Sequence, residues 1–402
     1  LCGNPSDDTY SKLYKHDPQD LIRKHYFMIE PEETAFTLDV KPINYPEKCE
    51  LKQLHLLTRH GSRYPTFNDI PSFDQLEKIF ANVPVAQKWK FPINSRGEKE
   101  PYFDGKQSVL RYNKFWKDVK KTRYDPECVK FQAGASSRCG ASAMAFSEGL
   151  YNGDGPLDTC KNQPVYIWNI PADQDNILVM FNNCKLLNDT VFNNNPVYNE
   201  QNSTYANTTL SPIAERMSKD YGIYPTLNPY LVPHIYDYCG YWVLHFNRTD
   251  TWCSLLSELD IKKLRYYWDM TNYYLHEYGN PLNEQIGCVY FTQLVNSVEN
   301  YINGSSIMVA DLKNGQSYGM FAILTTLGVH KNPFPLTADL PFPKLMKLNE
   351  EKSKKIRLVL NFVPLLIPGC ESEYCEWSTF KKVLGNKIGC DFDKLCGNYL
   401  NK

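Results

Sequence analysis

The chain has 402 residues, of which 42% are hydrophobic and 14% aromatic, and its formal net charge at pH 7 is −1. A chain of this length can bury a large core, as one large domain with an insertion or as two domains. The near-zero charge argues against a broad basic face for nucleic acid, so any positive field is local to a pocket. No apolar run reaches the roughly 18 to 20 residues of a membrane span.

The first third of the chain predicts an arm followed by core elements. Residues 1–45 are polar and punctuated by proline, which predicts an N-terminal arm. The apolar run 50–58 predicts a first buried strand, and residues 103–121 predict a helix. A second strand over Cys128–Phe131 is then followed by a small-residue helix that starts near Arg138.

The middle of the chain, residues 153–290, predicts a mostly helical insertion, because it is rich in Asn, Tyr and Pro and contains helix-like segments such as 261–278. Glycosylation sequons, most of them in this region, occur at Asn188, Asn202, Asn207, Asn247 and Asn303. Together with the cysteines they favour the secretory pathway. The chain begins at Leu1 without a charged leader, as a mature secreted protein would.

Strand and helix patterns return in the last third of the chain. We expect a strand over Ser306–Ala310, a helix over Gly319–Val329, and a strand followed by a turn within 356–367. This is typical of an α/β core resumed after an insertion. The predicted fold is therefore α/β, with a central mixed, mostly parallel sheet flanked by helices and formed by residues 46–152 and 291–402.

Cysteine spacing predicts disulfides rather than a metal site. The thirteen cysteines include no Cys-x-x-Cys pair, and the histidines outside the motif described next lack metal-ligand spacing, so we expect no metal or other cofactor. Short separations favour local disulfides, Cys370 with Cys375 and Cys390 with Cys396. Because thirteen is odd, one thiol is left over, and we expect Cys139 to be a buried free cysteine.

The most specific motif lies directly after the first strand. Residues 58–66 read TRHGSRYPT, so Arg59 and Arg63 bracket His60 at a strand end. Two guanidinium groups can bind the oxygens of a phosphoryl group bidentately while the imidazole attacks phosphorus. Gly61 lets the backbone approach closely. The motif predicts a phosphate site.

This nonapeptide resembles the signature of the histidine acid phosphatases, a branch of the histidine phosphatase superfamily. Segments 246–256 and 366–375 are similar to the multiple inositol polyphosphate phosphatase and phytase-like branch. The resemblance covers roughly residues 45–396. It implies an α/β phosphatase core and a small phosphorylated ligand.

A second phosphate-binding element is implied by residues 135–146, which resemble the family's arginine followed by a small-residue helix. The resemblance maps that arginine onto Arg138. It therefore implies that His60 is the nucleophile and that Arg59, Arg63 and Arg138 bind phosphate.

The chain departs from the family pattern at its late motif, His-Asp or His-Ala-Glu, in which the histidine binds phosphate and the acid protonates the leaving oxygen. No histidine lies between the expected strand Ser306–Ala310 and the helix that follows. One register places Gln316 and Tyr318 at the positions of His and Glu, which removes both groups. The other places Ala310 and Asp311 on His-Asp, which keeps the acid. The sequence leaves both registers open.

Two functions follow from this departure, because losing a positioned general acid typically costs about a hundred- to ten-thousand-fold in rate. In the first, the chain is a weakly active or inactive relative that captures a phosphorylated or other small organic ligand, with Gln316 lining the phosphate site. In the second, it is an active acid phosphatase for inositol polyphosphates or similar esters, working through phospho-His60 with Asp311 as proton donor. In both, we expect a secreted glycoprotein; the sequence does not set its oligomeric state.

Overall fold

The computed structural model describes residues 38–43, 45, 49–86, 96–119, 124–151, 164–329, 343–350, 354–360 and 363–398. These residues divide into two compact units. The helical unit contains residues 64–86 and 204–267, and the sheet unit contains the other described residues. Within the described residues, every helix is too short or too polar to cross a lipid bilayer.

The sheet unit is organised around a mixed sheet, whose strands, within the described residues, are ordered β3-β2-β4-β1-β5-β6-β7, with β8 beside β6. Their bounds are β1 Glu50–Arg59, β2 Val129–Ala133, β3 Ile167–Asn169, β4 Ala310–Gly315, β5 Pro343–Glu350, β6 Lys354–Leu360, β7 Val363–Leu365 and β8 Cys375–Glu376. Strands β3, β2, β4 and β1 are parallel, and the remaining pairings are antiparallel. The predicted α/β fold with a mixed sheet is confirmed, and its parallel part is the half that contains β1.

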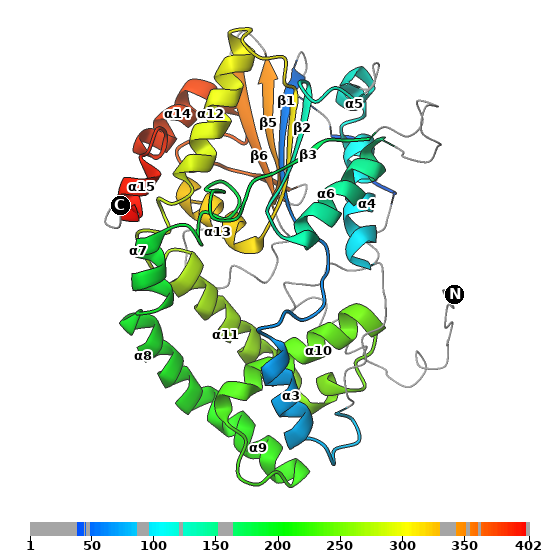
Figure 1. Cartoon of the computed structure of the whole chain (residues 1–402), viewed down its shortest axis with the longest axis vertical. Coiled ribbons are helices and arrows are strands. Elements are labelled where there is room, and N and C mark those ends of the chain that lie inside the picture. The colour runs from blue at the N-terminus through cyan, green and yellow to red at the C-terminus, as the bar shows by residue number, and fades with distance from the viewer. Residues whose placement is uncertain are drawn as a thin grey trace. The chain divides into compact units, whose positions relative to one another are not determined.

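Helices cover both faces of this sheet (Figure 1). One face packs against α4 (Arg96–Arg111), α5 (Asn113–Val119) and α6 (Ser137–Tyr151). The opposite face packs against α12 (Cys288–Ile302), α13 (Ser317–Leu327) and α14 (Trp377–Leu384). The side chains of β1 alternate accordingly, because successive strand residues point to opposite faces: Leu56 packs toward α4–α6 and Leu57 toward α12–α14.

Helices α4 and α6 approach unusually closely, at positions where glycine is required. A Cβ on Gly105 would lie 2.3 Å from the carbonyl oxygen of Phe146, and one on Gly149 would lie 1.9 Å from that of Tyr102. Only hydrogen side chains leave room for backbones this near to each other. The two helices are therefore held in a fixed relation, and both carry residues of the site described below.

The remaining α-helices are divided between the two units. The sheet unit also contains α7 (Lys185–Leu187) and α15 (Phe392–Leu395), and the helical unit contains α3 (Ile70–Ile79), α9 (Ser211–Tyr221) and α10 (Val232–Phe246). Helices α8 (Pro196–Tyr205) and α11 (Glu258–His276) each contribute residues to both units.

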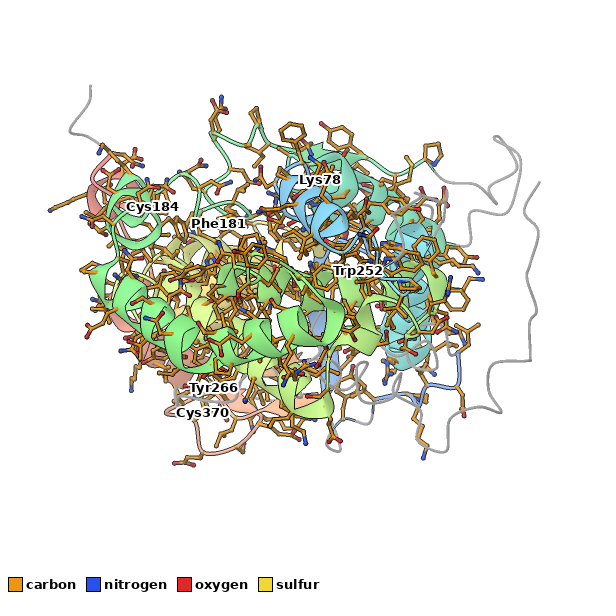
Figure 2. The ribbon with its side chains drawn as sticks, turned by 90° about the horizontal axis from the view of Figure 1, so that it is seen from below. Lys78, Phe181, Cys184, Trp252, Tyr266 and Cys370 are labelled. Atoms are coloured by element: carbon orange, nitrogen blue, oxygen red, sulfur yellow. A yellow bond between two sulfur atoms is a disulfide. The ribbon has the colours of Figure 1, made fainter. Side chains whose placement is uncertain are left out.

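The core of the helical unit is aromatic. Trp252, labelled in Figure 2, is fully buried and stacks on Tyr238 with ring centroids 4.5 Å apart, while Phe80 meets it edge-on at 5.5 Å. Phe73 of α3 stacks on the same Tyr238 at 4.4 Å, so an early segment of the chain joins the later helices.

The observed division differs from the predicted one in its boundaries. We expected one continuous insertion over 153–290, whereas the helical unit also takes in residues 64–86, and residues 164–203 belong to the sheet unit. Ring packing between distant segments causes the difference, and composition along the chain does not reveal such packing. The predicted arm, 1–45, lies outside the described residues except for 38–43 and 45.

Four disulfides tie the described residues together: Cys184–Cys396, Cys239–Cys253, Cys288–Cys390 and Cys370–Cys375. The predicted local bond between Cys370 and Cys375 is confirmed, as is the free buried Cys139, but Cys49 and Cys128 are free as well, so more than one thiol is left over among the described residues. The predicted bond between Cys390 and Cys396 is wrong, because each of them bonds a cysteine far away in the sequence.

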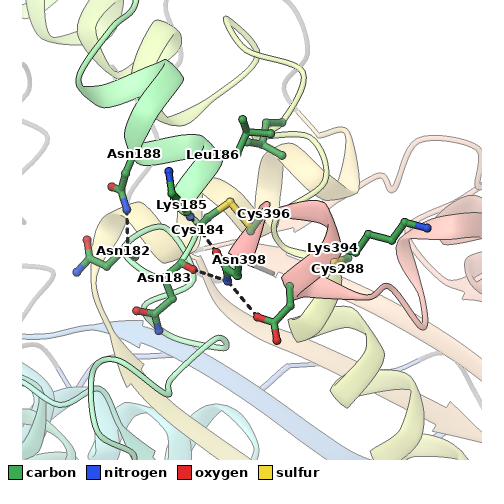
Figure 3. The surroundings of a disulfide bond; sticks show 12 residues. Asn182, Asn183, Cys184, Lys185, Leu186, Asn188, Cys288, Lys394, Cys396 and Asn398 are labelled. Carbon is green, nitrogen blue, oxygen red and sulfur yellow. Dashed lines mark hydrogen bonds between the residues drawn. A yellow bond between two sulfur atoms is a disulfide. The ribbon is translucent and has the colours of Figure 1, made fainter. Parts of the chain in front are cut away.

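The C-terminal segment reaches these distant partners by packing against α7, as Figure 3 shows around Cys184 and Cys396. The backbone N–H of Leu186 donates to the carbonyl oxygen of Cys396 at 2.8 Å. The side-chain amide of Asn398 donates to the backbone carbonyl oxygen of Asn183 at 3.0 Å. The sequence spacing of the cysteines gives no sign of this docking.

The late strand begins four residues after the position we predicted. We expected Ser306–Ala310, but β4 runs over Ala310–Gly315, between β1 and β2. Its polar residues are nevertheless buried, because Asp311 pairs with Lys313 on the same face of the strand. The hydrophobicity pattern therefore placed the strand too early in the sequence, because the buried charges of this strand neutralise one another. The following helix, α13, is close to its predicted position.

Candidate active site

His60 lies at the carboxyl end of β1, where the structure fixes both its position and its tautomer. Its backbone N–H donates to the carbonyl oxygen of Gly315 at the end of β4, 3.0 Å away. Its ring Nδ1 lies 2.8 Å from the carbonyl oxygen of Gly61. A carbonyl can only accept a hydrogen bond, so Nδ1 carries the proton and Nε2 keeps its lone pair. Nε2 is thus the nitrogen of His60 that can act as a nucleophile.

The loop after His60 is anchored by two helices. The N–H of Gly61 donates to Oγ of Ser142 on α6 at 2.9 Å. The N–H and the hydroxyl of Ser62 both donate to the carboxylate of Glu100 on α4, at 2.7 Å in each case. A Cβ on Gly61 would lie 2.0 Å from the carbonyl oxygen of Gly97, which requires glycine there.

Glu100 and Ser142 are site residues that our sequence analysis missed. Ser142 had a usable signal, because it lies four residues after Arg138 and residues four apart share one face of a helix. Glu100 had none, since its contact with Ser62 depends on how α4 packs against the loop.

The three predicted arginines act together on His60. Arg138, in the first turn of α6, has a buried Nε that forms no hydrogen bond within the described residues. Burial and, to a smaller extent, the positive charges of Arg59, Arg138 and Arg63 together lower the pKa of His60 from 6.5 to about 2, against the opposing effect of the Gly61 carbonyl. A neutral imidazole among three guanidinium groups is a setting in which an anion binds favourably.

Asp311 occupies a different place from the one expected. In register it pairs with His55 of β1, four residues before the strand end marked by the pairing of Arg59 with Gly315. It is 3% exposed and forms an ion pair with Lys313, and His55 Nδ1 lies 3.8 Å from its carboxylate. Although burial opposes it, the charge of Lys313 holds the pKa of Asp311 below its ordinary value. The expectation that Asp311 follows the strand is therefore wrong.

Gln316 directly follows β4 and is the N-cap residue of α13, but its side chain does not cap the helix. It is half-buried and adjoins Gly315, the residue bonded to the His60 backbone. The N-terminus of α13, with its unpaired N–H groups and positive dipole end, thus begins beside the His60 loop. Of the two registers, the one that starts at Gln316 is the one that follows the strand.

An aromatic cluster stands at the beginning of α13. Tyr318 is 41% exposed and stacks on His276, with ring centroids 3.9 Å apart and planes 14° apart. The ring of Phe181, labelled in Figure 2, meets Tyr318 edge-on at 5.6 Å. The ring centroids of Phe192 and His276 lie 5.3 Å apart. We refer to Tyr318, His276, Phe181 and Phe192 as the aromatic cluster.

The described residues contain no group of three or more His, Cys, Asp and Glu side chains arranged to hold a metal ion. The chemistry available at this site therefore consists of one nucleophilic nitrogen, three guanidinium groups, a helix N-terminus and neutral side chains at positions 316 and 318.

Comparisons with known proteins agree with this geometry. Residues 50–322 match the model of the histidine phosphatase superfamily (branch 2), a span that includes β1, α6 and the start of α13. Multiple inositol polyphosphate phosphatase 1 of Dictyostelium discoideum is 26% identical over 278 residues, which cover 64% of this chain and 43% of that protein. The match thus extends over less than half of that relative's length.

Two solved structures share the fold. The phytase from D. castellii aligns with a TM-score of 0.70 at 16% identity, covering 96% of this chain and 91% of that one. Multiple inositol polyphosphate phosphatase of Bifidobacterium longum, solved in complex with inositol hexasulfate, aligns with a TM-score of 0.66 at 11% identity, covering 92% and 99%. At such identities the likeness concerns the fold. Because the family model matches well over half of the chain, from the first strand to the helix after Gln316, this protein belongs to the histidine phosphatase superfamily, branch 2.

Proposed function

We propose that this protein binds the phosphoryl group of phosphomonoesters at His60 and forms a phosphohistidine there, with slow turnover of alkyl esters. The observation that carries the proposal is the state of His60, whose Nδ1 is held by the Gly61 carbonyl and whose Nε2 lone pair lies amid the charges of Arg59, Arg63 and Arg138. The positive charges of three guanidinium groups around a neutral imidazole favour the binding of an anion.

The arginines would supply most of what phosphoryl transfer needs. Catalysis of this reaction consists largely of positioning and charge neutralisation, because the protein performs little covalent chemistry beyond the attack itself. Arg138 offers a buried Nε that forms no hydrogen bond to any residue the structure describes, and the N-terminus of α13 adds its N–H groups and dipole on the side of Gly315. Ser142 and Glu100 hold the loop so that His60 does not have to be ordered when the ligand arrives.

Proton donation to the leaving oxygen is the weak step. We infer that Gln316 stands at the position of the family's phosphate-binding histidine and Tyr318 at that of its acid, because these residues follow β4. Asp311 is ionised, buried and paired with Lys313, so it lacks the proton that a donor must give. An alkoxide leaves slowly without a proton, and the expected penalty is about a hundred- to ten-thousand-fold.

The names of the relatives suggest the ligand class. One relative is a multiple inositol polyphosphate phosphatase, and a structural neighbour was solved with inositol hexasulfate. We therefore propose that inositol polyphosphates or related polyanions bind at His60 and are hydrolysed slowly.

We further propose that the protein is secreted and N-glycosylated. Four disulfides are typical of the secretory pathway. Three sequon asparagines, Asn207, Asn247 and Asn303, are exposed, whereas the side-chain amide of Asn188 donates to the carbonyl oxygen of Asn182. Glycan mapping by mass spectrometry after expression in a eukaryotic secretory host is expected to find glycans at the three exposed asparagines. Unmodified asparagine at all three would contradict this.

The test of the site combines binding with trapping of the intermediate. Calorimetry with inositol hexasulfate, which cannot transfer a phosphoryl group, is expected to show binding that Arg138→Met weakens. Acid-labile phosphate on the protein after mixing with radiolabelled phosphomonoester is expected in the parent and absent in His60→Ala. If inositol hexasulfate and inorganic phosphate both fail to bind, the proposal is refuted. Binding without any phosphoprotein would leave capture alone as the function.

A further inference from the structure

The structure carries one inference about the substrate of this site, and it rests on the function proposed above. We propose that the esters this protein turns over fastest are aryl phosphomonoesters, whose aromatic leaving group stacks on Tyr318 of the aromatic cluster. Two independent observations support this. One is the lack of a carboxyl group at positions 316 and 318, and the other is the exposed, stacked ring of Tyr318.

Leaving-group acidity explains why the missing carboxyl group selects aryl esters. A phenol has a pKa of about 10, as the tyrosine side chain shows. Water, which an aliphatic alcohol resembles, has a pKa of about 16. A phenolate therefore departs as an anion, whereas an alkoxide requires a proton in the transition state. A site with strong anion binding and a poor proton supply discriminates between the two classes by chemistry alone.

Tyr318 lies three residues after the residue that bonds the His60 backbone. Gly315 accepts the hydrogen bond from the His60 backbone, and the three residues from Gly315 to Tyr318 span at most about 11 Å. The tyrosine ring is supported from behind by His276 at 3.9 Å and braced at its edge by Phe181 at 5.6 Å. With 41% of its surface exposed, Tyr318 offers an aromatic ring near the N-terminus of α13, suited to stacking with another ring.

The cluster is also uncharged. Burial lowers the pKa of His276 to about 3, so its imidazole is neutral above that pH and acts as an aromatic ring rather than as a cation or a proton donor. Residue 277, directly after it, is Glu277, which is 6% exposed. Burial and the charge of Asp269 raise the pKa of Glu277 to about 7, so it holds a proton in acid solution. Glu277 is the competing source of a proton, and the experiment below includes it.

The proposed step balances without any further reactant. Nε2 of His60 attacks phosphorus as the phosphorus–oxygen bond to the ring breaks, and the electron pair leaves with the aryl oxide, which takes a proton from water. Water then attacks the phosphohistidine, the phosphorus–nitrogen bond breaks, and its electron pair returns to Nε2. The attacking water gives its proton to solvent, and inorganic phosphate is released.

The dependence of kcat/KM on leaving-group pKa tests the first half of the proposal. Substituted phenyl phosphates, phenyl phosphate and glycerol 2-phosphate form a series of rising leaving-group pKa. We expect kcat/KM to fall steeply along the series, with p-nitrophenyl phosphate turned over at least about a hundredfold faster than glycerol 2-phosphate. A nearly flat series would overturn the proposal, because it would show that a proton donor operates.

Variants of Tyr318 and Glu277 test the second half. Tyr318→Ala should raise KM for phenyl phosphates about tenfold more than it raises KM for acetyl phosphate, which has no ring. Tyr318→Phe keeps the ring and should behave as the parent. A loss of glycerol 2-phosphate turnover in Tyr318→Phe or in Glu277→Gln would identify a proton donor and refute the proposal. Tyr166→Ala is the matched control, since Tyr166 is 55% exposed and directly precedes β3, at the opposite strand end.

Failure of this inference can be told apart from failure of the proposed function. Inorganic phosphate binding and phosphohistidine formation, both dependent on His60, report the function whatever the leaving group. If these persist while Tyr318→Ala changes KM for phenyl phosphates and KM for acetyl phosphate by the same factor, the proposed substrate class is wrong and the proposed site is right. If Tyr318→Ala unfolds, Tyr318→Leu, which keeps an apolar side chain on α13, replaces it, with the same expected rise in KM.

Discussion

The backbone N–H of His60 donates to the carbonyl oxygen of Gly315, 3.0 Å away, which joins the loop after β1 to the end of β4. The same carbonyl accepts from the buried thiol of Cys139 at 3.5 Å. The loop after β1 and helix α6, which contains Cys139, thus both bond the end of β4. Gln316 directly follows Gly315, whereas Asp311 lies four residues before Gly315 within β4, so this contact supports our proposal for the register that begins at Gln316.

The nucleophile is tested by His60→Ala. We expect phosphohistidine formation to disappear and ester hydrolysis to fall on the order of a thousandfold or more, because the attacking group is lost. The thermal midpoint should remain close to that of the parent. His234→Ala is the control, as His234 is a half-exposed histidine paired with Asp237. Hydrolysis equal to the parent in His60→Ala would point to another nucleophile or to a contaminating phosphatase.

Rebuilding the family's late motif tests the assignment of Gln316 and Tyr318. Gln316→His combined with Tyr318→Glu restores a phosphate ligand and a proton donor, and should raise turnover of glycerol 2-phosphate about a hundredfold or more. The alternative repair, Ala310→His, should not raise it.

Ala310 is fully buried in the core between the sheet and α4–α6. A histidine there overfills the core and should lower the free energy of unfolding by about 1 to 3 kcal/mol. Higher activity from Ala310→His alone, measured beside its urea unfolding curve, would reverse our choice of register.

The role of Glu100 is tested through phosphate affinity. Glu100→Ala removes the acceptor of the Ser62 N–H and hydroxyl, so the loop that carries His60 and Arg63 loses its attachment to α4. We expect the Kd for inorganic phosphate to rise about tenfold, which corresponds to about 1.4 kcal/mol. Glu100→Gln keeps one acceptor oxygen and should have a smaller effect.

Glu98→Ala is the matched control, because Glu98 is exposed in the first turn of the same helix. Equal phosphate affinity in the parent and in Glu100→Ala, measured by calorimetry, would show that the loop holds its shape without this carboxylate.

Acid stability should depend on His55. This residue is 4% exposed, its Nε2 donates to Oε1 of Gln53 at 3.0 Å, and burial lowers its pKa from 6.5 to about 4, opposed by Asp311 and aided by Lys313. The unfolded chain therefore binds this proton more readily than the folded one. The stability contribution is complete above about pH 6.5 and is lost as pH falls toward 4, amounting to about 3 kcal/mol.

Urea unfolding followed by circular dichroism across pH 4 to 7 checks this expectation. His55→Gln removes the titrating group, so the dependence of stability on pH in this window should flatten. An unchanged slope in His55→Gln would show that other groups control acid stability.

Part of this protein could be predicted from its sequence because the relevant interactions are local. Strand β1 follows from an apolar run, and Arg59, His60 and Arg63 are neighbours on one loop, so the chain itself guarantees their proximity. The role of Arg138 could be predicted because residues 135–146 resemble a known element of the family. The α/β class followed from alternating strand and helix patterns, which report burial within each element.

The rest was decided by contacts between distant segments. The position of β4 depends on its hydrogen bonds to β1 and β2 and on the mutual neutralisation of Asp311 and Lys313, which a hydrophobicity pattern reads as polar and exposed. Glu100 reaches Ser62 only because α4 packs against the loop. Sequence separation carries no information on such contacts, because their geometry exists only once the sheet and its helices are assembled.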